Sequence, residues 1–110
     1  MTAYALMHVR SVPAQPNPEV VEYLQRIDAT LDPFGGRFRA HGDDFTVVEG
    51  TWGPGAILIE FPDEEKAHGW YRSPAYQEIT ALRTNSIEGD IILLNGVPEG
   101  YRGADALAHH

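Results

Sequence analysis

The middle of the chain places two helix-start signals directly after an apolar strand pattern. Ala56 to Phe61 (AILIEF) is apolar apart from one charge, which is typical of a buried strand. Asp63 follows, and aspartate is a favourable residue at the N-cap of a helix. Ser73 and Pro74 form a second start signal, because serine caps helices and proline is suited to the first helical position. This part of the chain therefore predicts a strand followed by two consecutive helical segments.

The remaining elements complete a β-α-β-β-α-β order. Asn17 is a suitable N-cap for a helix whose apolar stripe ends at Leu31. Arg37–His41 and Phe45–Glu49 are short extended runs, and their spacing predicts a hairpin or a bulged, bent strand pair. Further strands are expected at Ala3–Val9 and Ile91–Leu94. The expected fold class is α+β, a ferredoxin-like βαββαβ fold with a four-stranded antiparallel sheet.

The predicted strands are apolar on both faces. Leu6 and Met7, for example, point to opposite sides of the sheet. Both helices of a ferredoxin-like fold cover the same face, so the other face is apolar and uncovered, which predicts a partner. A second copy is the simplest partner, and we expect a homodimer whose sheets face each other as a dimeric α+β barrel. The domain is expected over residues 1–96, and residues 97–110 form a C-terminal tail.

Composition excludes several classes of protein. The 110 residues have room for one domain, and a net charge of −8 argues against nucleic acid or anionic membrane as a partner. The absence of cysteine excludes disulfides, thiolate metal sites and a cysteine nucleophile. No apolar run approaches the ~20 residues of a membrane span, and no signal peptide is visible. We therefore expect a soluble, cytoplasmic protein.

Several turn glycines and aromatic residues recur at characteristic spacings. They are Phe34-Gly35-Gly36-Arg37-Phe38, Val48-Glu49-Gly50-Thr51-Trp52-x-Pro54, Ile59-Glu60-Phe61-Pro62, Ala67-x-x-Trp70-Tyr71-x-Ser73-Pro74-x-Tyr76-Gln77 and Arg83. From Ala3 to Gly96 this pattern resembles the uncharacterised bacterial family called domain of unknown function 1330, of the dimeric α+β barrel superfamily. The resemblance implies the same fold and dimer, but no reaction. Relatives in the superfamily include cofactor-independent oxygenases, muconolactone-isomerase-like enzymes, haem-dependent proteins and binding modules. The similarity to these proteins is one of fold and does not assign a function.

Two polar residues, His8 and Glu60, interrupt the apolar strands. If both point into the barrel interior, they form a His–carboxylate pair in a largely apolar cavity, with one as general base and the other orienting it. Alternatively, Glu60 pairs with an arginine that staples the sheet, and His8 bonds a backbone carbonyl. We treat His8 and Glu60 as candidate catalytic residues.

Basic residues of the next strand are candidates for binding a substrate. By alternation, Arg37, Arg39 and His41 share one face of that strand. They line a pocket for an anion, which arginine grips at two points, or they form the solvated face of an edge strand. Arg39 and His41 are retained as candidates.

The helical segments after Asp63 supply three more candidates. Arg83 follows an apolar helical stripe, so it pairs with Glu60 or Glu49, binds a ligand acid, or lies exposed. Tyr71 and Tyr76 are expected in the core, with a hydroxyl reaching the cavity as the alternative. The candidate set for substrate binding is therefore Arg39, His41, Tyr71, Tyr76 and Arg83.

These candidates support two functions. The first is a small-molecule-binding protein that acts as a cofactor-independent enzyme, by proton transfer or oxygenase-type chemistry, on a small, partly apolar, acidic metabolite. His8 or Glu60 would move a proton, and Arg83 or Arg39 would hold the substrate anion. The second is a non-catalytic dimeric module that binds a ligand or stabilises a partner. No metal is expected because no HxH, HxxxH or HExxH spacing occurs, and no cofactor is expected.

Overall fold

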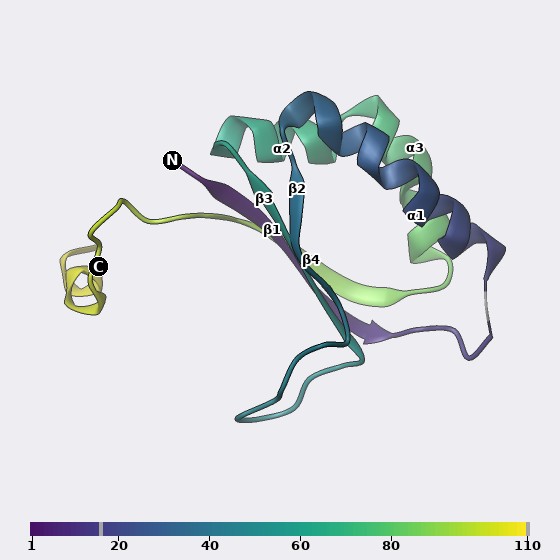
Figure 1. Ribbon diagram of the computed structural model, residues 1–110, viewed down its shortest axis with the longest axis horizontal. Coiled ribbons are helices and arrows are strands. Elements are labelled where there is room, and N and C mark those ends of the chain that lie inside the picture. Colours follow the sequence, from purple (N-terminus) through teal and green to yellow (C-terminus); the bar gives the residue numbers. More distant parts are fainter. Residues whose placement is uncertain (16, 110) are drawn as a thin grey trace.

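The computed structural model describes residues 1–15 and 17–109, without the side chain of His109. The elements are β1 (Ala3–Ser11), α1 (Pro18–Leu31), a 3-10 turn η1 (Asp32–Phe34), β2 (Arg37–Gly42), β3 (Gly55–Phe61), α2 (Glu64–Arg72), α3 (Pro74–Thr84), β4 (Glu88–Asn95) and a 3-10 helix η2 (Gly103–His109). The strands form one antiparallel sheet in the order β2-β3-β1-β4, and α1, α2 and α3 lie on the same side of it (Figure 1). The predicted ferredoxin-like α+β fold is confirmed.

The helices begin where the capping signals predict. The Asn17 side chain accepts hydrogen bonds from the backbone N–H groups that open α1. Asp63 accepts from the Lys66 N–H at 2.8 Å, and the Ser73 hydroxyl accepts from the Tyr76 N–H at 3.2 Å. Each cap satisfies donors that have no partner within the helix. The local chemistry of the sequence thus explains why the second helical stretch divides into α2 and α3.

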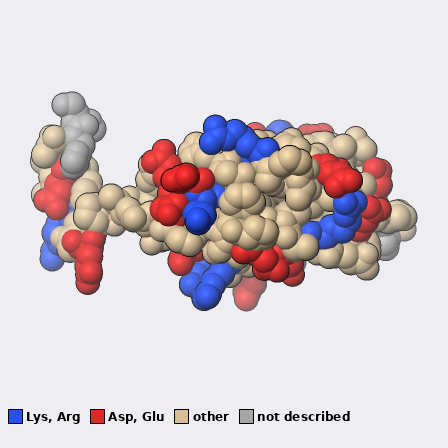
Figure 2. Space-filling model, turned by 90° about the horizontal axis from the view of Figure 1, so that it is seen from above, with Lys and Arg blue, Asp and Glu red and all other residues tan. Residues whose placement is uncertain are grey.

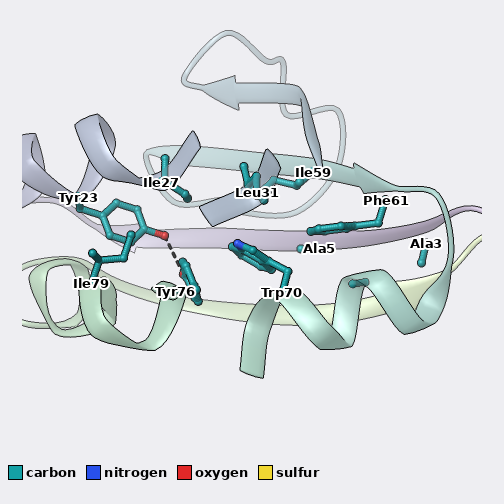
Figure 3. Close-up of a cluster of buried hydrophobic side chains, with 11 residues drawn as sticks. Ala3, Ala5, Tyr23, Ile27, Leu31, Ile59, Phe61, Trp70, Tyr76 and Ile79 are labelled. Atoms are coloured by element: carbon teal, nitrogen blue, oxygen red, sulfur yellow. Dashed lines mark hydrogen bonds between the residues drawn. The ribbon is translucent and has the colours of Figure 1, made fainter. Parts of the chain in front are cut away.

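Alternation along β1 assigns its side chains to two faces. Ala3, Ala5, Met7 and Val9 are buried beneath the helices. The residues between them are half-buried, and by alternation they lie on the face away from the helices, which we call the open face. The core on the helix side contains Leu31, Phe61, Trp70, Tyr76 and Ile79, each at most 2% exposed (Figure 3).

The prediction of a strand at Phe45–Glu49 is wrong. These residues are exposed and lie in a loop, residues 43–54, that projects beyond the sheet between β2 and β3 (Figure 1). Gly42 ends β2 with a left-handed φ of 124°, which turns the chain away from the sheet. The hairpin or bulged pair predicted for this run and the one before it is therefore not formed; a bulge occurs instead between β2 and β3, whose register shifts between Phe38 and Ala40.

Charged side chains on the face seen in Figure 2 form small mixed clusters of both signs. Separately from that view, the contacts of Arg26 join two helices: this residue of α1 contacts Glu22 on the same helix at 2.9 Å and Glu78 of α3 at 3.4 Å. The chain after β4 leads away from the body to η2 (Figure 1). Position 110 of the predicted tail lies outside the described residues.

Candidate functional site

A cavity of about 400 Å³ lies between the helix side of the sheet and helices α1 and α3. This volume falls in the range of small-molecule sites, which are mostly apolar with a few placed polar groups. Much of its wall comes from apolar side chains, among them Ala5, Met7, Ile27, Ile57, Ile59 and Ile91. We call this cavity the helix-side pocket.

Two buried tyrosines that line the helix-side pocket face each other through their hydroxyls. The Tyr23 and Tyr76 oxygens are 2.7 Å apart, and one hydroxyl donates to the other (Figure 3). Burial raises the pKa of Tyr23 well above its ordinary value, Tyr76 raises it further, and the nearby Arg83 opposes the rise. Tyr23 therefore stays neutral at physiological pH. The pair has one hydroxyl hydrogen left to donate to a ligand.

Arg83 brings a buried charge to the same pocket. It is 6% exposed and lines the cavity from the last turn of α3. Its Nε donor has no hydrogen-bond partner, and Arg83 takes part in none of the ion pairs among residues 1–15 and 17–109. An unsatisfied buried donor costs free energy, and a buried charge without a carboxylate costs more. The alternatives of pairing with Glu60 or Glu49, or of surface exposure, are therefore not observed.

The bulge in β2 separates the basic residues that alternation had placed on one face. His41 lies opposite Ile57, lines the pocket mouth and stacks on Phe38 with ring centroids 4.8 Å apart. Arg39 reaches the open face instead, where its Nε and Nη2 donate to the two Glu60 oxygens at 3.3 Å each. The expected common face of Arg37, Arg39 and His41 is wrong, because the extra residue of a bulge reverses the alternation after it.

The structure does not bring His8 and Glu60 together. Both lie on the open face, but His8 is opposite Ala56 whereas Glu60 is opposite Tyr4. Four residues of strand separate them, about 13 Å at ~3.3 Å per residue. Neither lines the helix-side pocket. The expected His–carboxylate pair in a shared cavity is therefore a wrong prediction, and the alternative of Glu60 pairing with an arginine is what the structure has.

The predictions for Tyr71 and Tyr76 have different outcomes. Tyr76 lines the pocket, as does Trp70 beneath it. Tyr71 is half-buried outside the pocket wall and packs on both, with ring centroids 6.2 Å from Trp70 and 5.7 Å from Tyr76. Tyr23 was missed as a pocket residue. The sequence gives one indication of this role, which is that Tyr23 carries a hydroxyl within an apolar helical stripe. A buried tyrosine hydroxyl usually needs a hydrogen-bond partner.

The described residues contain no group of three or more His, Asp and Glu side chains that could hold a metal ion. Among the same residues, no helix has the length and apolar character needed to cross a membrane.

Comparison with known proteins gives a family match over most of the chain. The model of the family described as "Domain of unknown function (DUF1330)" matches residues 2–97. The search of curated proteins finds no match.

Solved structures with the same fold include a protein of unknown function from Rhodopseudomonas palustris, at 18% identity and TM-score 0.67, covering 88% of this chain and 83% of that one. Another is a dimeric ferredoxin-like protein of unknown function from Jannaschia sp. CCS1, at 14% identity and TM-score 0.69, covering 87% and 100%. SnoaB, a cofactor-independent oxygenase from Streptomyces nogalater, is 15% identical with TM-score 0.50, covering 92% and 96%. At these identities the similarity is one of fold.

Proposed function

The chain belongs to the DUF1330 family, whose description assigns no reaction, and we propose that it binds a small, largely apolar molecule with an acidic group in the helix-side pocket. The observation that carries this proposal is Arg83. Its guanidinium is buried beside the cavity, its Nε lacks a partner, and no carboxylate of the described chain neutralises it. An anionic ligand would satisfy both the donor and the charge.

The neighbouring groups favour an anion over a cation. Arginine carries only hydrogen-bond donors, and the Tyr23–Tyr76 pair adds one further hydroxyl hydrogen. Charge-assisted hydrogen bonds of this kind are stronger than neutral ones, and apolar walls strengthen them further. The expected ligand therefore places a carboxylate, phenolate or enolate oxygen near Arg83 and an apolar body against the sheet.

Catalysis is a further step in this proposal. A site that stabilises an anion favours removal of a proton from a phenol or enol, which is the first requirement of proton-transfer or cofactor-independent oxygenase chemistry. SnoaB is described as a cofactor-independent oxygenase, and it supports this option through fold alone. The alternative is a non-catalytic binding module, which fits the absence of a carboxylate paired with Arg83 among residues 1–15 and 17–109. His41 and Asp43 are the candidate bases within the pocket wall.

The binding proposal is tested with a matched pair of fluorescent probes. 8-Anilinonaphthalene-1-sulfonate carries an anion, and N-phenyl-1-naphthylamine has the same apolar body without it. Arg83→Met is expected to weaken binding of the anionic probe about tenfold or more, because a charge-assisted bond contributes about 1.5–3 kcal/mol. Binding of the neutral probe should stay the same. Fluorescence titration gives both dissociation constants.

Arg39→Met is the control, because Arg39 lies on the opposite face of the sheet in its pair with Glu60. It should leave both probes unaffected. Equal weakening of both probes by Arg83→Met, or no weakening of either, would contradict an anion site at Arg83.

We also propose that the open face pairs two copies of the chain. Leu6 lies between Leu58 and Ile92 across the sheet, and the Ile92 side chain is 53% exposed. An apolar surface of this kind marks an interaction site, and a structural neighbour is described as dimeric. The homodimer would use the face opposite the helix-side pocket.

Ile92→Lys tests the homodimer, because it places a charge at the centre of the proposed interface. We expect the dissociation constant to rise at least about tenfold, since burying an unpaired charge is costly. Size-exclusion chromatography with light scattering, over a series of concentrations, measures the change. The matched control is Val21→Lys, at an apolar residue of α1 that is 49% exposed. Unchanged dimer stability in Ile92→Lys would exclude this face.

A further inference from the structure

The end of loop 43–54 is held against β1 by His8. The Gly53 N–H donates to His8 Nε2 at 3.0 Å, and the Trp52 ring lies on the His8 ring at a centroid distance of 4.2 Å. Trp52 Nε1 donates to the Gly55 carbonyl at 3.0 Å, which ties the same segment to the start of β3. A Cβ at Gly53 would collide with the Val9 carbonyl oxygen, so the loop backbone rests directly on the strand. The segment is therefore held closely, by the His8 side chain together with the Gly55 carbonyl and the Val9 backbone.

This contact requires an uncharged imidazole. A histidine nitrogen that accepts a hydrogen bond carries no proton, so the geometry assigns the hydrogen of neutral His8 to Nδ1. Adding a second proton at Nε2 would set two donors against each other, and the bond to Gly53 would be lost. Histidine side chains generally change charge between about pH 5 and 8. The contact can therefore be broken by a modest change of pH.

The charged groups around His8 lie on β1 and β4 and carry both signs. Asp90 on β4 places Oδ2 4.0 Å from His8 Nδ1, and it also accepts from Arg10 Nε at 3.0 Å. Arg10 makes a second contact, at 3.5 Å, with Glu88 of β4. The loop presents Trp52 and Gly53 to the ring, and β3 presents Ala56, so neither of these elements adds a charge there. Protonation thus exchanges the Gly53 bond for attraction to Asp90.

The released segment borders the helix-side pocket. Pro54 and Gly55 follow Gly53 directly, and both line the pocket mouth together with Gly42 and Asp43 at the start of the same loop. We propose that His8 is a positioning residue: its neutral ring latches loop 43–54 at the pocket mouth, and its protonation releases the loop. This assignment is independent of the ligand, because it concerns only how the mouth is held.

Acrylamide quenching of tryptophan fluorescence tests the latch in the intact protein. Trp70 is 1% exposed and shielded, whereas Trp52 is 43% exposed and reports on the loop. The quenching constant of the wild type is expected to rise roughly twofold between about pH 8 and about pH 5, as the loop leaves the strand. A flat profile over this range would overturn the proposal.

Three variants identify the group that titrates. His8→Gln keeps an acceptor in place of Nε2 without titrating, so quenching should stay low at every pH. Asp90→Asn removes the carboxylate 4.0 Å from His8 Nδ1 and leaves the acceptor for Gly53 in place, so the rise with falling pH should remain. His68→Gln is the control, because His68 lies on α2 beside Glu64, and it should keep the wild-type profile. A wild-type profile in His8→Gln would overturn the proposal.

Light scattering at both ends of the pH range separates the latch from dimerisation. We expect the oligomeric state of the wild type to stay constant while quenching changes. A dissociation that follows the quenching profile would assign the titration to a subunit interface and would overturn the latch.

Discussion

Replacing Trp70 by alanine is expected to lower the free energy of unfolding by about 3–5 kcal/mol, the usual loss for a large aromatic residue in a core. Trp70 is 1% exposed and lies between Phe61 and Tyr76, with ring centroids 5.4 Å and 4.1 Å away (Figure 3). Its Nε1 also donates to the Thr30 hydroxyl at 3.0 Å, which joins α2 to α1. The substitution therefore removes the contact that holds two helices and the sheet together. Urea denaturation followed by circular dichroism measures the loss.

Trp52→Ala is the matched control for this prediction. Trp52 is 43% exposed, and its contacts are the tilted ring contact with His8 and the hydrogen bond to the Gly55 carbonyl. We expect a loss of about 1 kcal/mol, because an exposed loop side chain buries little area. Equal losses in the two variants would contradict the assignment of Trp70 to the core.

Arg83→Met is expected to raise the free energy of unfolding by about 1–3 kcal/mol, because it replaces an uncompensated buried charge with an apolar side chain of similar length. Methionine is unbranched and adapts to irregular cavities. The variant would keep the wall of the helix-side pocket while removing the unsatisfied Nε. Binding sites often contain residues that lower the stability of the ligand-free protein, because those residues are needed to bind the ligand. Thermal and urea denaturation without added ligand give the change.

The comparison variant is Arg39→Met, which removes an exposed pair with Glu60. Exposed pairs contribute about 0–1 kcal/mol, so this variant should be unchanged or slightly less stable. A clear loss of stability in Arg83→Met would show that Arg83 supports the fold, and the anion site would lose its main argument.

Local chemistry made the helices predictable from the sequence. Asn17, Asp63 and Ser73 each satisfy backbone donors within a few residues, so their effect does not depend on the rest of the fold. Arg83 could be recognised for a similar reason, because it continues an apolar helical stripe. Tyr23 could not be, since a tyrosine in such a stripe is most often part of the core.

The open-face residues were misread because their partners are distant in the sequence. Glu60 interrupts an apolar strand, which suggested a catalytic cavity, yet its partner Arg39 comes from the neighbouring strand and reaches it through a bulge. His8 is satisfied by Gly53, 45 residues away. A bulge position and a loop contact depend on how the strands pair, and alternation within one strand does not contain that information.

Strand β1 sets a limit on how chains of this kind can change length. Met7 belongs to the wall of the helix-side pocket, while Leu6 and His8 belong to the opposite side of the same strand. Inserting one residue before this segment would move Leu6 and His8 towards the helices and Met7 away from them, so both surfaces would be lost together. An insertion in residues 44–51 would move neither set. Variation in length should therefore be tolerated in that loop and excluded from β1.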